Sequence, residues 1–348
     1  MADTIIAAGF GHCRTYVDIL APIKAFDRLQ RRHRTLAVPM AVIKKFADDQ
    51  GGNLSALIAY YGFFSLFPLL LVFVTGLGFV LDGNPSAQHA VLNSALKDIP
   101  IVGDQIKAGS LTGSTPALVI GLVGAVLSGL GVTLAAQTAF QRVHGIPHRE
   151  RPDFLFSRLR GLGLLAVLGT LQVVSTVASG LVTGGFGGPL LVVAGIAVSL
   201  ATNMVLFVAA FRLLTDGDVP NRDLWPGIIS ATLLWTGLQA VGGAYIGHVV
   251  KGAGATYGTF ATVIGLLTWI FLGARIVVYS AELNSVLSGH LWPRSLFDPV
   301  EPADRRALST LAKIEERSDL QHVAVTFDDP PHDEQLQLPT EPGRRDDG

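Results

Sequence analysis

The residues best suited to chemistry share one face of a predicted helix in the stretch 257–287. At 100° per residue, five polar side chains there fall within about 60° of one another, while the remaining positions are almost all apolar. A charge inside such a helix costs about 2.5–3.5 kcal/mol on insertion scales, so it usually faces the bundle interior beside a partner. An arginine in that position favours an anionic ligand, such as a carboxylate. The five residues are Tyr257, Thr268, Arg275, Tyr279 and Glu282.

Structural roles are the alternatives for both charges on this face. Arg275 can form a structural ion pair or extend to the membrane surface, and Glu282 can simply lie at the helix end. The two residues are seven positions apart, which is about 10.5 Å of helix rise, so we expect them to approach through water or a third residue.

A second polar group lies in the apolar stretch 54–81, where Tyr60, Tyr61 and Ser65 precede Pro68. Proline removes the backbone donor to the carbonyl of residue 64 and loosens the helix, and Ser65 can satisfy the freed carbonyl. Pro68 is therefore a candidate hinge, and a kink that serves packing alone is the alternative.

Four amide side chains occur singly in otherwise apolar stretches. In lipid, such amides face neighbouring helices and form hydrogen bonds there. They either line a polar path together with Thr268 and Arg275 or only hold helices together. These residues are Gln137, Gln172, Asn203 and Gln239.

The sequence lacks the motifs of common enzyme classes. It has no HExxH zinc motif, phosphate-binding P-loop or dinucleotide fingerprint, and Cys13 is its one cysteine. A ribonuclease needs carboxylates or histidines that hold a catalytic metal, and the expected inner loops 142–160 and 212–223 are too short for a nuclease domain. We therefore expect no enzyme activity, no cofactor, no metal site and no nucleic-acid partner.

The composition places these residues in a membrane. Of 348 residues, 49% are hydrophobic and 15% are charged, whereas soluble domains average about 25% charged residues. Since a spanning helix needs about 20 apolar residues, we expect an all-α, polytopic helical bundle within residues 51–290. Its six expected transmembrane helices are 54–81, 116–141, 161–183, 190–211, 224–250 and 257–281.

Polar segments flank this bundle. Residues 1–50 contain apolar positions at helical spacing beside lysines and arginines, which predicts short amphipathic helices on anionic lipid. A soluble helical cap is the alternative. We also expect short amphipathic helices in the first outer loop, 86–115, and a charged helix at 303–317 within a tail, 291–348. This tail should be disordered from about residue 327.

The distribution of positive charge predicts the orientation. With both termini inside, 22 of the 26 Lys and Arg residues lie in inner segments and three lie in outer loops. The positive-inside rule therefore predicts six spans with both ends in the cytoplasm.

Several motifs resemble the YihY/BrkB family of bacterial inner-membrane proteins. The most specific are AYYxxxSLFP at 59–68, YGTFA at 257–261 and AELN at 281–284; FQRVHGIP and VPNRDLWPG lie between them. The resemblance covers about residues 38–290. It implies six helices and a plasma-membrane location, and some members carry a ribonuclease BN label while others carry a virulence label.

The leading functional prediction is a transporter or permease-like protein for a small molecule or ion. The alternative is a scaffolding membrane protein whose polar residues only join helices. Substrate and oligomeric state are left open by the sequence.

Overall fold

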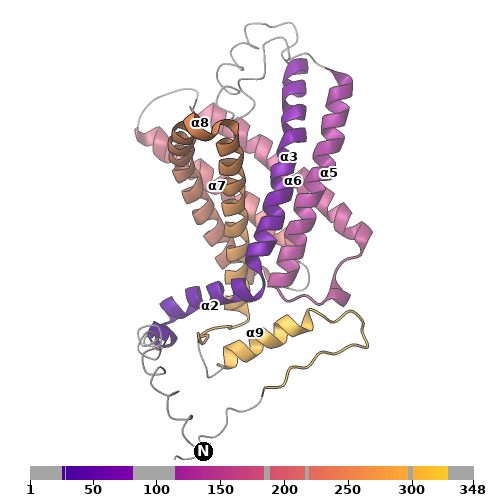
Figure 1. Cartoon of the computed structure of the whole chain (residues 1–348), viewed down its shortest axis with the longest axis vertical. Helices are drawn as coiled ribbons and strands as arrows, with labels where there is room; N and C mark the ends of the chain where they lie inside the picture. Colours follow the sequence, from indigo (N-terminus) through magenta and orange to yellow (C-terminus); the bar gives the residue numbers. More distant parts are fainter. Residues whose placement is uncertain are drawn as a thin grey trace, which may run out of the picture.

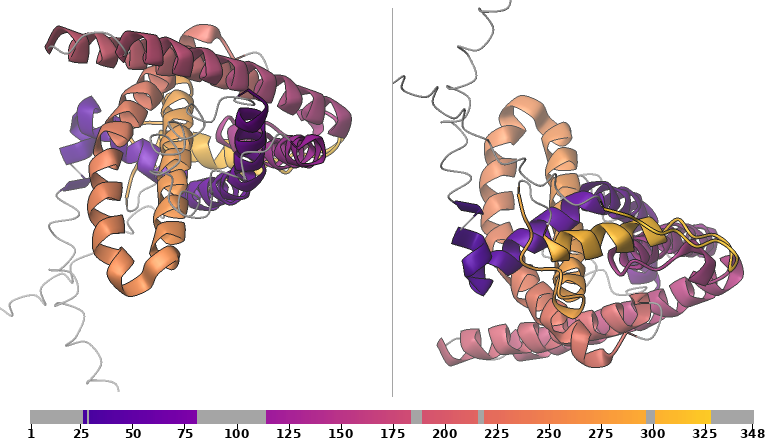
Figure 2. Two further views of the ribbon diagram at one scale, coloured as in Figure 1. Left: turned by 90° about the horizontal axis from the view of Figure 1, so that it is seen from above. Right: turned by 90° about the horizontal axis from the view of Figure 1, so that it is seen from below.

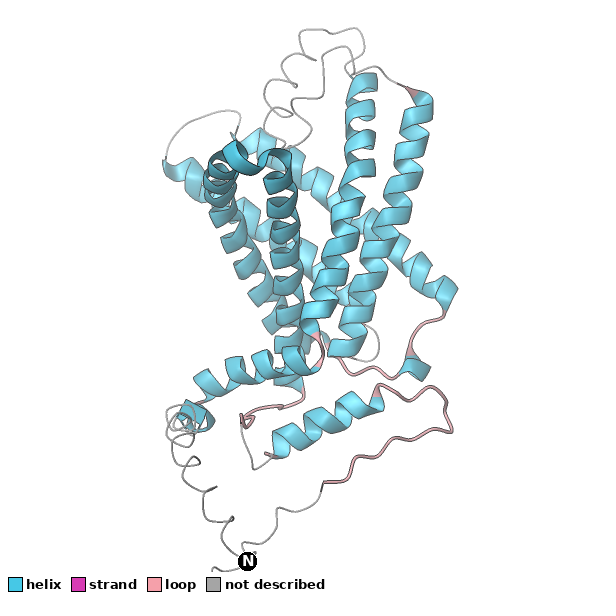
Figure 3. Ribbon diagram, in the orientation of Figure 1, coloured by secondary structure: helices cyan, strands magenta, loops and turns pink. Residues whose placement is uncertain are grey.

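The long helices of the protein cover the apolar stretches of its sequence, and shorter charged helices flank them. A computed structural model describes residues 26–27, 29–80, 114–183, 189–215, 219–296 and 301–327. In these residues all regular secondary structure is helical, as Figure 3 shows. The elements are α2 (Arg34–Asp48), α3 (Gly51–Val80), α5 (Thr115–Val143), the 3-10 helix η3 (His148–Glu150), α6 (Phe154–Thr183), α7 (Pro189–Leu214), α8 (Asn221–Ser288) and α9 (Pro302–Lys313).

The membrane-length helices form a bundle, and α2 and α9 lie across one end of it (Figure 1). In the described part of the chain, five segments are long and apolar enough to cross a membrane. The predicted all-helical membrane bundle is therefore confirmed. The predicted span 224–250 is not among the five, and a total of six spans stays a prediction. The five segments are Gly51–Gly76, Thr115–Val143, Phe154–Leu171, Ala197–Leu214 and Val263–Ser288.

Both segments predicted as the fifth and sixth spans lie within α8. This helix has 68 residues and would be about 100 Å long if it were straight. It instead folds back on itself, as Figure 2 shows. The stretch 242–258 contains six glycines, which make bending easier. The structure thus differs from the predicted separation at 251–256, because the backbone remains helical through the turn.

The two halves of α8 touch near the ends of the helix. The backbone N–H of Gly227 donates to Oδ1 of Asn284 at 2.6 Å. A Cβ atom at Gly227 would lie 2.3 Å from the carbonyl oxygen of Ser280, so only glycine fits there. The hydroxyl of Ser280 also donates to that of Ser230 at 3.4 Å. Direct backbone contact therefore closes the base of this helical hairpin.

Glycines bring α3 and α5 into close contact. A Cβ atom at Gly124 would lie 3.0 Å from the Pro68 ring, and one at Gly131 would lie 2.5 Å from the Tyr61 ring. Small residues allow such approach in lipid, where packing rather than water drives helix association. The candidate hinge Pro68 therefore lies against a neighbouring helix.

The buried core gathers at the end of the bundle where α2 and α9 lie, which we call the α2–α9 end. Its largest hydrophobic cluster combines the first turns of α8 with the last turns of α5, α7 and α8. Members from these turns include Phe140, Val143, Phe211, Leu224, Ile228, Val278 and Ala281. This closely packed hydrophobic cluster therefore holds nearby polar side chains in place.

The flanking segments are helical where the structure describes them. α9 begins with a capping box between Glu301 and Asp304 and ends at Lys313, four residues before the end predicted for this helix. Predictions for residues 1–25, 81–113 and 328–348 lie outside the described residues.

Candidate functional site

A sharp turn between α2 and α3 places the end of α2 against α8. Gln50, between α2 and α3, has a φ of 57° in the left-handed region. The next residue, Gly51, packs so tightly under the Phe46 ring that a Cβ atom there would lie 2.3 Å from it. The last turn of α2 therefore presents Lys45 and Phe46 to the second half of α8.

Three buried ionisable side chains meet at this turn. Nζ of Lys45 contacts the carboxylate of Asp49, lies 3.0 Å from Oε2 of Glu282 and donates to the carbonyl oxygen of Val143 at 2.8 Å. The three side chains are at most 6% exposed. Burial alone would lower the pKa of Lys45, but the charges of Glu282 and Asp49 outweigh burial and raise it. The lysine therefore stays charged and joins α2, α5 and α8.

Arg275 lies seven residues, or about two helical turns, before Glu282 of this cluster, and it is surrounded by aromatic rings. Its Nη2 donates to the Tyr279 hydroxyl at 3.3 Å. Its guanidinium carbon is 5.5 Å from the centre of the Phe46 ring and 5.6 Å from those of Phe271 and Tyr279. Tyr279 in turn stacks on Phe46 at 3.8 Å. Among the described residues no carboxylate pairs with Arg275, so cation–π contacts are its main compensation.

A pocket of about 360 Å³ lies between α3 and α8, further along the polar face. It is lined by Tyr60 of α3 and by Thr268 and Phe271 of α8, with small and apolar neighbours. Since the Phe271 ring also contacts the guanidinium of Arg275, the pocket is adjacent to the aromatic group around that arginine. The structure therefore brings together Tyr60, Thr268, Arg275 and Tyr279 of the predicted path.

Glu282 does not pair with Arg275, although both residues lie on the same helix. The sequence placed both charges on one face, and the structure pairs Glu282 with Lys45 rather than with the arginine. Oε1 of Glu282 has no hydrogen-bond partner within the described ranges. The carboxylate is completely buried, so its role is more than that of a polar residue at a helix end.

The amides lie elsewhere, between pairs of helices. Nε2 of Gln137 donates to the carbonyl oxygen of Ser157 at 3.1 Å. Nδ2 of Asn203 donates to the Thr236 hydroxyl and to Oε1 of Gln239, both at 3.1 Å. These bonds join α5 to α6 and α7 to α8. The side chains of Gln172 and Tyr257 lie outside those that the structure describes.

Two of the three candidate residues before Pro68, Tyr61 and Ser65, face α5 or their own helix. Tyr61 packs on Gly131 of α5. The Ser65 hydroxyl donates to the carbonyl of Gly62 at 2.7 Å. The expectation that Ser65 satisfies the carbonyl of residue 64 is therefore wrong, because its hydroxyl reaches one turn back to residue 62.

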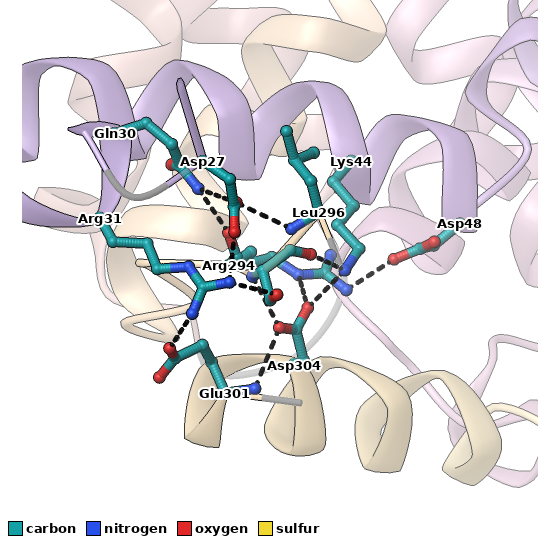
Figure 4. Close-up of polar contacts among 10 residues, drawn as sticks. Asp27, Gln30, Arg31, Lys44, Asp48, Arg294, Leu296, Glu301 and Asp304 are labelled. Atoms are coloured by element: carbon teal, nitrogen blue, oxygen red, sulfur yellow. Dashed lines mark hydrogen bonds and ion pairs between the residues drawn. The ribbon is translucent and has the colours of Figure 1, made fainter. Parts of the chain in front are cut away.

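A second polar cluster, shown in Figure 4, ties the N-terminal segment to the C-terminal segment. Asp304 of α9 accepts hydrogen bonds from Lys44 and Arg294, both at 2.8 Å, and from the backbone N–H of Ser295 at 2.9 Å. Arg294 also pairs with Asp48 at 2.8 Å. We call this cluster the clasp; its further members are Asp27, Gln30, Arg31 and Glu301.

The carboxylates of the clasp are held in their charged form. Burial alone would raise the pKa of Asp304, but hydrogen bonds from Lys44, Ser295 and Arg294 outweigh burial and lower it. The pKa of Asp27 is lowered too: burial would raise it, and hydrogen bonds from Leu296 and Arg31 reverse the effect. Both carboxylates therefore remain ionised at neutral pH and hold their partners.

Sequence reasoning missed Lys45, Arg294 and Asp304 as buried residues. Lys45 was expected on an amphipathic helix at the membrane surface, beside Phe46. Both side chains instead pack against the base of the bundle. The available signal was weak: a lysine within an apolar helical face, and a lone arginine just after the last apolar stretch.

The described part of the chain offers no metal centre. Among the described residues, no three His, Cys, Asp or Glu side chains are grouped so that they could hold a metal ion. The polar face instead ends in a lysine–carboxylate cluster and is bordered by aromatic rings. Together with the membrane-length helices, this arrangement defines a multi-pass helical membrane protein.

Comparison with known proteins gives the family. Residues 42–301 match the family described as virulence factor BrkB, and the chain belongs to this family. The resemblance inferred from the sequence motifs is therefore confirmed.

Several relatives are similar over most of their length. An uncharacterized protein of Dickeya dadantii is 27% identical over 282 residues, covering 72% of this chain and 84% of that protein. The inner membrane protein YhjD of Escherichia coli is 24% identical, covering 72% and 81%. YfkH of Bacillus subtilis, whose name describes it as ribonuclease-like, is 21% identical, covering 71% and 93%. No solved structure matches the chain.

Proposed function

We propose that the protein is a permease of the plasma membrane, with a polar path along the face of α8 that contains Thr268 and Arg275. The observation that carries this proposal is the pocket of about 360 Å³ between α3 and α8. Residues from both predicted groups, Tyr60 and Thr268, line it. A pocket formed by two membrane-length helices and bordered by an arginine is suited to binding a small solute within the bilayer.

The α2–α9 end closes this path. Past Arg275, the next polar positions of the face are Tyr279, covered by the Phe46 ring, and Glu282, paired with Lys45. Both covering residues belong to the last turn of α2. If this turn moved away from α8, Arg275 would become accessible from the α2–α9 end. In this proposal α2 therefore acts as the gate.

The charge of Arg275 favours an anionic or carboxylate-bearing substrate. Its compensation comes from rings and one tyrosine hydroxyl, with no carboxylate among the described residues. A bound anion would provide the missing opposite charge and form charge-assisted hydrogen bonds. A protein whose arginine were already paired would gain less from such a ligand.

The first test asks whether water reaches the pocket. In a Cys13→Ser background, Thr268→Cys should react with a small, water-soluble methanethiosulfonate reagent. The matched control is Val278→Cys on the same helix, because Val278 is completely buried in the hydrophobic core. Equal and negligible reaction at both positions would contradict a water-filled path.

The second test asks what crosses. Metabolite uptake and export should be compared between cells that lack the gene and cells that express the wild type, Arg275→Leu or Arg275→Lys. We expect Arg275→Leu to insert normally and to lose the transport difference, and Arg275→Lys to restore part of it, since lysine keeps the charge without the planar fork. Full activity of Arg275→Leu would remove Arg275 from the path.

A scaffolding protein is the second candidate, favoured by the amide contacts. Gln137 and Asn203 form bonds between helix pairs rather than around the pocket. If both tests above fail while the protein accumulates normally, the amides and the clasp would serve assembly alone. We further propose that the protein has no ribonuclease activity; RNA cleavage by pure protein that a point substitution abolishes would refute this.

The predicted cytoplasmic side is the α2–α9 end, where we propose contact with anionic lipid. Leu36 and Ile43 of α2 are exposed and lie seven residues apart on one face, and Leu29 is exposed just before this helix. Such exposed apolar side chains, beside Arg32, are suited to lying in the headgroup layer.

A further inference from the structure

A second and larger pocket lies at the α2–α9 end, outside the proposed path. Its volume is about 560 Å³, and it is bounded by the end of α8, the end of α5 and one face of α9. Backbone pairing just beyond the pocket holds the end of α9 in place: the N–H groups of His148 and Arg149 donate to the carbonyl oxygens of Ile314 and Glu316 at 3.1 and 3.0 Å. The pocket is therefore built from three separated parts of the chain.

The charges lining this pocket have one sign. Arg305, Arg306 and Lys313 of α9 all contribute to the wall, whereas the described lining contains no Asp or Glu. Arg306 and Lys313 lie seven residues apart and so share one face of the helix. Arg306 donates to the carbonyl oxygen of His290 at 2.7 Å. The structure shows no ion pair to a described residue for either Arg306 or Lys313.

The opposite wall contributes two hydrogen-bonding side chains, His144 and Ser285. Nδ1 of His144 bonds the carbonyl oxygen of Phe140 at 2.9 Å, so Nδ1 must carry the proton. Burial lowers the pKa of His144 to about 4; the Phe140 carbonyl opposes this and the charge of Lys45 adds to it, so the ring is neutral at pH 7. Its Nε2 is then an acceptor, buried and without a hydrogen-bond partner among the described residues. Ser285 places a hydroxyl on the same pocket.

This combination selects a definite ligand chemistry. Guanidinium and ammonium groups bind phosphate oxygens through charge-assisted hydrogen bonds. A neutral imidazole acceptor requires a donor, which a phosphate ester supplies through a hydroxyl on its organic part. We propose that the pocket binds a phosphate group that carries a neighbouring hydroxyl, as in glycerol phosphate. The source is either a free metabolite or the headgroup of a lipid such as phosphatidylglycerol.

Two probes distinguish these sources. Equilibrium dialysis with radiolabelled glycerol 3-phosphate measures the free compound on the purified full chain in detergent. Native mass spectrometry of protein released from nanodiscs of phosphatidylglycerol or phosphatidylcholine measures retained lipid. Saturable binding of either probe supports the proposal and names its source; binding of neither overturns it.

The variants test the pocket itself. Lys313→Gln should weaken binding about tenfold, and Arg306→Gln combined with it should weaken binding further, because each removes a charge-assisted hydrogen bond. Arg306→Lys/Lys313→Arg should retain binding. Arg317→Gln is the matched control, since that side chain is 73% exposed and pairs with Glu315 outside the pocket. Unchanged affinity in Lys313→Gln and in the double variant would overturn the proposal; if the double variant fails to fold, Lys313→Gln alone decides.

Discussion

Lys45 joins three helices at the α2–α9 end. A lysine that contacts two carboxylates and a carbonyl with almost no exposure to water is stable only while all of its partners are present. The interaction compensates for dehydrating three charges, so its presence adds little net stability, but its disruption strands the partners.

Lys45→Met should therefore destabilise the protein by about 3–5 kcal/mol, measured by chemical unfolding in detergent. Adding Glu282→Gln should recover part of this loss, because it removes one of the two stranded carboxylates. Arg32→Met, at an exposed position on the same segment, is the control and should change little. Losses that simply add in the double variant would contradict a coupled buried cluster.

Asp304 predicts a pH dependence for the clasp. Its folded-state pKa lies below the usual 3.8, so its contribution to stability is present above the unfolded pKa and is lost as pH falls through the folded value. Asp304→Asn should lower the melting temperature by about 5 °C or more at pH 5–7. The difference from wild type should shrink below about pH 4.

The matched control for this change is Asp319→Asn, whose side chain is 95% exposed. It should change the melting temperature little at any pH in this range. A difference between Asp304→Asn and wild type that stays constant down to pH 3 would show that the carboxylate charge is unimportant there.

At the scale of elements, the α8 hairpin depends on contact between its two backbones. Gly227→Ala would place a methyl carbon 2.3 Å from the Ser280 carbonyl oxygen, well inside van der Waals contact, and backbone cannot rotate away as a side chain can. We expect a loss of about 1–3 kcal/mol in unfolding experiments. Gly237→Ala, on the same helix with open space around it, should be neutral or stabilising by up to about 1 kcal/mol. Equal effects would argue against this contact.

Periodicity predicted the elements and part of the site, for physical reasons that also explain the failures. Uncharged length identifies membrane helices directly, and helical spacing places Tyr279 one turn from Arg275, so that contact was foreseeable. The Lys45–Glu282 pair joins two helices that are far apart in the sequence, and no local pattern encodes such a contact. The continuous turn of α8 escaped prediction because its glycines suggest a loop as readily as a bent helix.

At the scale of the whole molecule, the orientation can be tested by labelling. In a Cys13→Ser background, a cysteine at Ser94, in the predicted outer loop, should react with an impermeant maleimide on whole cells. A cysteine at Ser318, which is exposed beyond α9, should react only after permeabilisation. This expectation follows from the excess of Lys and Arg in the predicted inner segments. The reverse pattern would invert the topology.

Truncation separates the clasp from the tail. A chain that ends at Asp328 keeps α9 and should accumulate and melt like the full protein. A chain that ends at Leu296 lacks Asp304 and Glu301, leaves Arg294 without one of its partners, and should melt at lower temperature or be degraded. Comparable stability of both truncations would mean that the clasp contributes nothing.

The clasp also imposes an order on biosynthesis. Lys44 and Asp304 are 260 positions apart, so the N-terminal helix leaves the ribosome long before its partner exists. Until the last membrane helix and α9 have emerged, its basic side chains must wait in solvent or against lipid, where proteases can reach them. Docking of that helix is thus possible only for a nascent chain that is nearly complete. In an incomplete chain this helix would stay undocked, and proteases of the cell's quality-control machinery could recognise it.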